Sequence, residues 1–122
     1  MKYGLFFLVM LFTLSAAQAQ SSLFGDESNV ITYMDGKTFN NSDNGLDIEY
    51  GYISDYNTYG IIVTNKNGGV FYFINVEITT YGSYADLYGM SAEDGSNFGF
   101  RLYKGKLIVG SGESGEQTFY LK

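Results

Sequence analysis

Beyond residue 29 the sequence consists of short segments in which apolar and polar residues alternate, each ending in a turn-forming pair or a polar loop. In residues 46–53 (LDIEYGYI), for example, Asp47 and Glu49 share one face, and apolar or aromatic side chains occupy the other. Successive side chains of a β-strand point to opposite faces, so this alternation predicts half-buried strands. The three- and four-residue spacing of an amphipathic helix is not found after residue 19. The pattern therefore restricts the chain to an all-β fold.

The turn signals divide the chain into eight or nine short predicted strands. The first hairpin is predicted to have strands at residues 30–34 and 37–40, joined by Asp35-Gly36, a pair that suits a type I′ turn. The remaining strands are predicted at residues 46–53, 58–64, 70–78, 84–90, 98–103, 106–110 and 117–121. Such a succession of short strands and turns is typical of an antiparallel sheet in which sequence neighbours pair.

We expect these strands to close into a small antiparallel up-and-down barrel or rolled meander, with a two-sheet β-sandwich as the alternative. Residues 70–76 (VFYFINV) are uncharged and strongly β-forming, and an exposed sheet edge of this kind promotes aggregation. The chain has no proline to interrupt pairing at such an edge. We therefore place this segment inside a closed sheet.

Residues 1–19 have the features of a cleavable signal peptide. Lys2 precedes an apolar run at residues 4–14, and Ala17 and Ala19 have the small-x-small spacing that signal peptidase accepts. The apolar run is shorter than the roughly 20 residues that a spanning helix needs. We therefore expect a secreted or periplasmic protein with no membrane span, a disordered tail at residues 20–29 and an all-β domain at residues 30–122.

The chain contains no His and no Cys, which excludes several chemistries. Nucleophilic catalysis that depends on imidazole or thiol groups is unavailable, as is typical zinc, haem or iron–sulfur ligation. No glycine-rich nucleotide-binding motif opens a helix. The net charge of −6 opposes binding to nucleic acids and to anionic membranes. We expect a protein that is not an enzyme, with no cofactor, no metal and no nucleic-acid partner.

Two weaker signals involve oxygen ligands. Asp47 and Glu49 lie about 6–7 Å apart by strand rise, a separation that carboxylate pairs in glycosidases also use. Alternation alone produces this spacing on a solvated strand face. The loops at residues 41–47 and 93–97 carry oxygen ligands beside glycine, but neither matches an EF-hand. Ordinary Asx-rich turns use the same residues, and we favour that interpretation over calcium binding.

Aromatic residues give the main positive signal, because the chain holds 12 Tyr and 10 Phe. Alternation places Phe71 and Phe73 opposite the main apolar face of their strand. Tyr103 follows Arg101, the only arginine of the chain, by two residues. Together with Tyr59, these are our candidate binding residues. Exposed aromatic rings and a planar cation suit a protein interface or stacking on a sugar. The alternative is that the aromatic rings fill a small core.

We therefore expect a secreted, non-catalytic binding module whose partner is a protein or a glycan. Two alternatives remain open. One is a structural or adhesive protein that self-associates through strand edges. The other is a small lipocalin-like barrel that carries an apolar ligand. The exposure of Phe71 and Phe73 discriminates between an aromatic binding surface and an aromatic-filled core, because covered side chains would belong to the core and exposed ones would form a surface patch.

Overall fold

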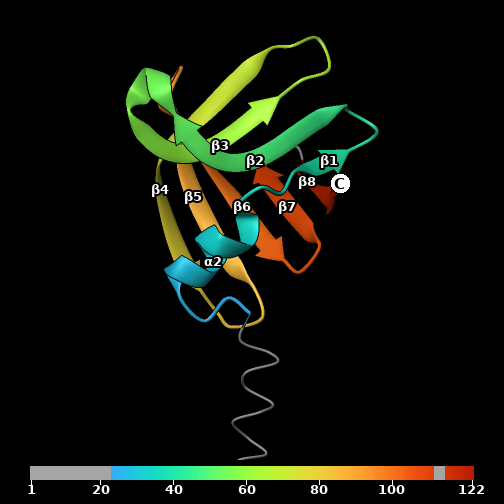
Figure 1. The fold of residues 1–122 in the computed structure, drawn as a ribbon. Helices are drawn as coiled ribbons and strands as arrows, with labels where there is room; N and C mark the ends of the chain where they lie inside the picture. Colours follow the sequence, from blue (N-terminus) through green and yellow to red (C-terminus); the bar gives the residue numbers. More distant parts are fainter. Residues whose placement is uncertain (1–22, 112–114) are drawn as a thin grey trace, which may run out of the picture.

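Eight antiparallel strands close into one barrel in which each strand pairs with its neighbours in sequence (Figure 1). The computed structural model describes residues 23–111 and 115–122, so the predicted signal peptide lies outside the described residues. The strands are β1 (Phe39–Asn41), β2 (Leu46–Ile53), β3 (Thr58–Thr64), β4 (Val70–Thr80), β5 (Ala85–Ser91), β6 (Asn97–Tyr103), β7 (Lys106–Ser111) and β8 (Gly115–Leu121). β1 pairs with β8 to complete the closure. The predicted up-and-down barrel is confirmed, and the sandwich alternative is wrong.

The predicted first strand is wrong, because these residues belong to helix α2 (Glu27–Met34). Asp26 is the N-cap, and its side chain accepts a hydrogen bond of 2.8 Å from the backbone N–H of Asn29. Val30 and Met34 lie about one helical turn apart and are both buried. The β-branched residues within this segment favour a strand locally, but the cap and the burial of one helix face outweigh that preference.

Of the disordered tail predicted at residues 20–29, residues 20–22 lie outside the described residues, and residues 23–26 precede α2 and make a long-range contact. Phe24 is fully buried and forms an antiparallel bridge with Gly82. The N–H of Phe24 donates to the Gly82 carbonyl at 2.9 Å, and the N–H of Gly82 donates back at 3.2 Å. The Phe24 ring packs edge-on against Tyr33 of α2, with 5.2 Å between ring centroids. This long-range bridge orders the segment. The sequence there has no alternation of apolar and polar residues that would predict the bridge.

Helix α2 closes one end of the barrel, where the β4–β5 connection lies (Figure 1). Val30 and Met34 belong to the same buried cluster as Leu102 and the other interior residues of the strands. The Tyr33 hydroxyl accepts a hydrogen bond of 2.7 Å from the backbone N–H of Gly105 in the β6–β7 turn. Among the described residues, no helix has the length and apolar character required to cross a membrane.

The core of the barrel is made of inward-facing aliphatic and aromatic side chains. Its fully buried members on the strands are Phe39, Ile48, Ile61, Ala85, Leu87, Leu102, Leu107 and Phe119. Burial of each large apolar side chain stabilises the fold by about 1.5–3 kcal/mol. β4 lies between β3 and β5, as predicted for the β-rich segment that it contains, and it pairs with β3 through residues 70–73 and with β5 through residues 73–80.

A β-bulge in β4 interrupts the alternation of this strand. Ile74 pairs with Met90, but the next pair joins Glu77 to Tyr88, so β4 has one extra residue at this point. Asn75 lies within the bulge and has a φ of 52°, in the left-handed region. Asparagine tolerates this conformation better than most other residues.

The bulge reverses which positions of β4 face the barrel interior. Before it, Phe73 packs against the core, and beyond it Val76 and Ile78 do so. A one-residue shift moves every later side chain to the opposite face. The alternation of inward and outward side chains therefore does not continue in one phase along the whole of β4, contrary to the prediction for residues 70–78.

Candidate ligand-binding sites

The predicted site residues lie in separate places on the barrel. Phe71 and Phe73 pair with Val63 and Ile61 of β3, and residues directly opposite each other in a sheet share a face. Val63 and Ile61 are buried in the barrel interior, so both phenylalanines point inward. Their predicted outward orientation is wrong, and the bulge of β4 is the reason. Their role in binding stays a prediction.

Phe71 and Phe73 line a cavity of about 320 Å³ at the end of the barrel opposite α2, which we call the barrel cavity. Its apolar lining consists of Leu46, Ile48, Val63, Phe71, Phe73, Phe98, Phe100, Val109 and Phe119. Phe73 makes edge-to-face contacts with Phe98 and Phe100, at centroid distances of 5.0 and 5.5 Å. Phe71 lies nearer the opening and is 44% exposed although it faces inward.

Polar side chains complete the lining of the barrel cavity. They are Ser91, Glu93, Asp94, Ser96 and Gln117. Asp94 accepts hydrogen bonds from the hydroxyl of Ser96 at 2.6 Å and from its backbone N–H at 2.9 Å. These bonds lower the pKa of Asp94, so its carboxylate stays ionised. Among the described residues that line the cavity, none is a lysine or an arginine.

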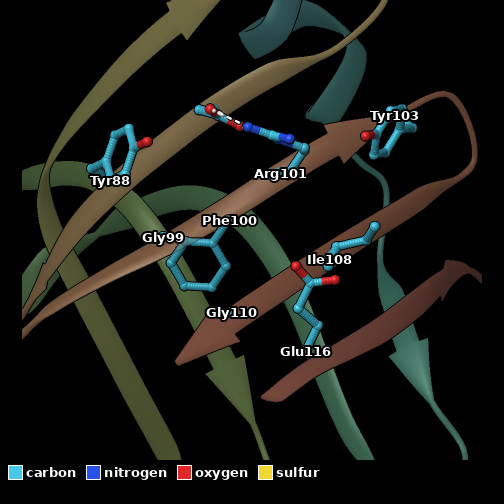
Figure 2. A pocket seen from close by; sticks show the side chains of 9 residues that line it. Tyr88, Gly99, Phe100, Arg101, Tyr103, Ile108, Gly110 and Glu116 are labelled. Atoms are coloured by element: carbon cyan, nitrogen blue, oxygen red, sulfur yellow. Dashed lines mark hydrogen bonds and ion pairs between the residues drawn. The ribbon is translucent and has the colours of Figure 1, made fainter. Parts of the chain in front are cut away.

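A second hollow, the outer groove, crosses the outer faces of β5 to β8 and measures about 260 Å³ (Figure 2). Gly99 of β6 pairs with Gly110 of β7 and forms its floor. Tyr88 of β5 lies opposite Gly99, and Glu116 of β8 lies opposite Gly110. The two glycines leave the middle of this row without side chains, and the groove is the resulting gap.

Arg101 lines the outer groove beside this row and is held by Asp86. Its Nε donates to one carboxylate oxygen of Asp86 at 2.7 Å, and its Nη2 donates to the other at 2.9 Å. The guanidinium also lies 4.7 Å from the centre of the Tyr84 ring. The hydrogen bonds to Asp86 raise the pKa of Arg101, so the cation is permanent. Asp86 is almost completely buried.

Tyr103 lies on the same outer face as Arg101, as predicted from their two-residue separation. Its ring centroid is 5.6 Å from that of Tyr84, which in turn stacks on Tyr81 at 4.7 Å. The Lys106 ammonium lies 5.1 Å from the Tyr103 ring centre. Three tyrosine rings and two cations therefore cluster beside Arg101 and Tyr103, the two members of this cluster that line the outer groove.

Tyr59 belongs to a third place, beside α2, and does not join either group. It is 60% exposed and contacts Tyr50 and Tyr52, at centroid distances of 6.2 and 5.3 Å. Tyr50 and Tyr59 line a shallow hollow together with Ile31 of α2. Partial burial, with smaller contributions from Glu27 and Tyr59, raises the pKa of Tyr50.

Sequence reasoning missed Asp86, Tyr88 and Glu116 as members of the outer groove. Asp86 was visible as the one charged residue in the predicted strand at residues 84–90. Tyr88 and Glu116 carry no such signal, because they meet only through the register of β5, β6, β7 and β8.

Asp47 and the Asx-rich turns, considered above for catalysis or calcium binding, make structural contacts. Asp47 accepts a hydrogen bond of 2.7 Å from the side-chain amide of Asn40 and forms an ion pair with Lys122. In the β1–β2 turn, the Asn41 side chain accepts from the backbone N–H groups of Asp43 and Asn44, which is an Asx-type turn. No group of three or more acidic side chains within residues 23–111 and 115–122 is placed to hold a metal ion.

Comparison with protein-family models finds no match, and comparisons with curated protein sequences and with solved structures find none either.

Proposed function

We propose that the protein is a non-catalytic binding protein that holds a small ligand with an apolar body in the barrel cavity. The observation that carries this proposal is the asymmetry of the barrel. One end is closed by α2, and the other opens into a cavity lined mainly by apolar side chains. Binding outside the cytoplasm is part of the proposal, and it rests on the signal peptide expected at residues 1–19.

The size and lining of the barrel cavity fit a small molecule better than a macromolecule. Its volume of about 320 Å³ lies at the lower end of the range of roughly 300–1,000 Å³ for small-ligand pockets. Phe71 leaves 44% of its surface in water while pointing into this cavity. A ligand that covers this ring gains about 25 cal/mol for each Å² of apolar surface removed from water.

The polar lining favours a particular kind of ligand head group. Glu93 and Asp94 bring negative charge to the cavity, and Asp94 stays ionised because Ser96 donates two hydrogen bonds to it. A carboxylate on the ligand would be repelled, whereas a hydroxyl or an ammonium group would not. The proposed ligand therefore combines an apolar body with a neutral or cationic head.

A displacement titration tests this function. N-phenyl-1-naphthylamine, a neutral apolar probe, should become fluorescent in the barrel cavity. Decanol and decylammonium should displace it, and decanoate, which has the same chain length and a negative head, should do so much less well. Absence of probe binding, or equal displacement by all three compounds, would contradict the proposal.

Barrel closure bears on the alternative of self-association through strand edges. Every strand from β1 to β8 has two neighbours in the closed barrel, so none lies at the end of a sheet, although β4 pairs with β3 only through residues 70–73 and with β5 only through residues 73–80. The segment that motivated this alternative therefore lies on a strand between two others, and not on a terminal strand of an open sheet. We therefore favour ligand binding over self-association.

A further inference from the structure

We infer that the outer groove is a second binding site and that its ligand is a neutral sugar residue of a glycan. The groove lies on the outer face of β5 to β8, whereas the barrel cavity opens inside the barrel. The inference is independent of the function proposed for the cavity.

The dimensions of the outer groove suit one sugar ring. Tyr88 and Glu116 stand at the two ends of a row that spans three inter-strand spacings, about 14 Å between backbones. Gly99 and Gly110 leave the space between them open, and Figure 2 shows the two end side chains on either side of this floor. A protein partner would need roughly 800 Å² of surface on this chain, far more than this hollow provides.

Tyr88 provides a platform on which a sugar can stack. Its ring rests against the backbone at Gly99, where an added Cβ would lie 3.4 Å from Cε1 of the ring. Half of the tyrosine surface remains exposed. One ring face is therefore supported by the strand and the rest is open to a ligand, and aromatic faces pack well against the C–H face of a sugar.

The polar groups of the groove match the hydroxyls of a sugar. Arg101 uses two of its five N–H donors on Asp86 and leaves 46% of its side chain exposed. Glu116 supplies a carboxylate acceptor on the opposite side (Figure 2). A sugar hydroxyl both donates and accepts, so neighbouring hydroxyls can satisfy a donor and an acceptor together. Asp86 fixes Arg101 in advance, which reduces the entropy lost on binding.

Charge decides which sugars fit. Arg101 is already compensated by Asp86, and Glu116 adds a further negative charge to the groove. The whole chain also carries a net charge of −6. Uronic acids and sulfated sugars are therefore repelled, and a neutral sugar is favoured.

The test uses variants that alter the groove and leave the fold intact. Gly110→Val fills the floor, and its Cβ would lie 4.0 Å from the Glu116 side chain, an ordinary contact. Valine also favours strands. Tyr88→Ala removes the platform. The matched controls are Thr64→Val on the outer face of β3 and Tyr59→Ala, a tyrosine that is also exposed but lies outside the groove.

The probes are cellohexaose, maltohexaose, mannohexaose and chitohexaose, with hexagalacturonate as the anionic comparison, each titrated by NMR at millimolar concentration. We expect at least one neutral hexasaccharide to bind, about tenfold or more weaker binding by Gly110→Val and Tyr88→Ala, and unchanged binding by both controls. Failure of every neutral sugar to bind, tighter binding of hexagalacturonate, or binding unaffected by Gly110→Val would overturn the inference. Retained N-phenyl-1-naphthylamine binding by Gly110→Val would show that the barrel cavity is a separate site.

Discussion

The side chain of Phe73 lies directly over Gly89 of the neighbouring strand, so closely that a Cβ at position 89 would be 2.9 Å from the Cβ of Phe73. Gly89 pairs with Phe98 on β6 and faces the interior. Its missing side chain is therefore what allows the aromatic ring of Phe73 to enter the barrel beside Phe98.

We predict that Gly89→Ala lowers the free energy of unfolding by about 1–3 kcal/mol, because the added methyl group overpacks the interior against Phe73. Urea denaturation measures this loss. Gly99→Ala is the matched control on the outer face, where the new Cβ would meet Tyr88 at an ordinary 3.4 Å. The control should stay within about 0.5 kcal/mol of the parent protein. Equal effects of the two substitutions would contradict the close approach at Gly89.

The bulge of β4 gives a second prediction. Asn75→Val should destabilise the fold by about 1–3 kcal/mol, because a β-branched residue is strained at a φ of 52°. Asn75→Gly should be tolerated, since glycine adopts positive φ without strain. Thermal unfolding of the two variants provides the comparison, and a valine variant as stable as the glycine variant would be evidence against the bulge.

Phe71 and Val70 offer a matched pair for the barrel cavity. Each is 44% exposed, but they are consecutive residues of one strand and point to opposite faces. Phe71→Ala should weaken N-phenyl-1-naphthylamine binding by about tenfold, equivalent to about 1.4 kcal/mol of lost apolar contact. Val70→Ala should leave the affinity unchanged. Fluorescence titration measures the affinity of both variants for the probe. Equal affinities would place the probe outside the cavity.

The raised pKa of Tyr50 predicts a loss of stability at alkaline pH. Burial disfavours the phenolate, so the folded-state pKa of Tyr50 lies above the ordinary value of 10.0. Below pH 10 the tyrosine is neutral in both states and its contribution is fully present. As the pH rises through the folded-state value, the unfolded chain releases this proton more readily, and stability falls.

Chemical denaturation at a series of alkaline pH values should therefore show a smaller loss for Tyr50→Phe than for the parent protein. Tyr120→Phe, at an exposed position on β8, is the control and should follow the parent curve. If Tyr50→Phe also follows the parent curve, folding does not raise the pKa of Tyr50.

The candidate sites could be predicted from the sequence only in part. Arg101 and Tyr103 were recognised because two-residue spacing places them on one face of one strand, a property of adjacent residues. Phe71 and Phe73 were recognised as a pair but assigned to the wrong face. The bulge at Asn75 changes which side chains of β4 face the interior. The alternation of apolar and polar residues in the sequence does not indicate where the bulge lies.

The sequence by itself determined an all-β fold of short antiparallel strands, and it favoured a barrel over a sandwich without deciding between them. Strands β2 and β3 begin and end where alternation and turn residues predict, because those signals depend on neighbours in the chain. Only the tertiary structure decided that residues 27–34 form a helix that closes the barrel, and that Tyr88 and Glu116 share a groove. These outcomes depend on burial and register between segments far apart in sequence, and local patterns carry no information about either.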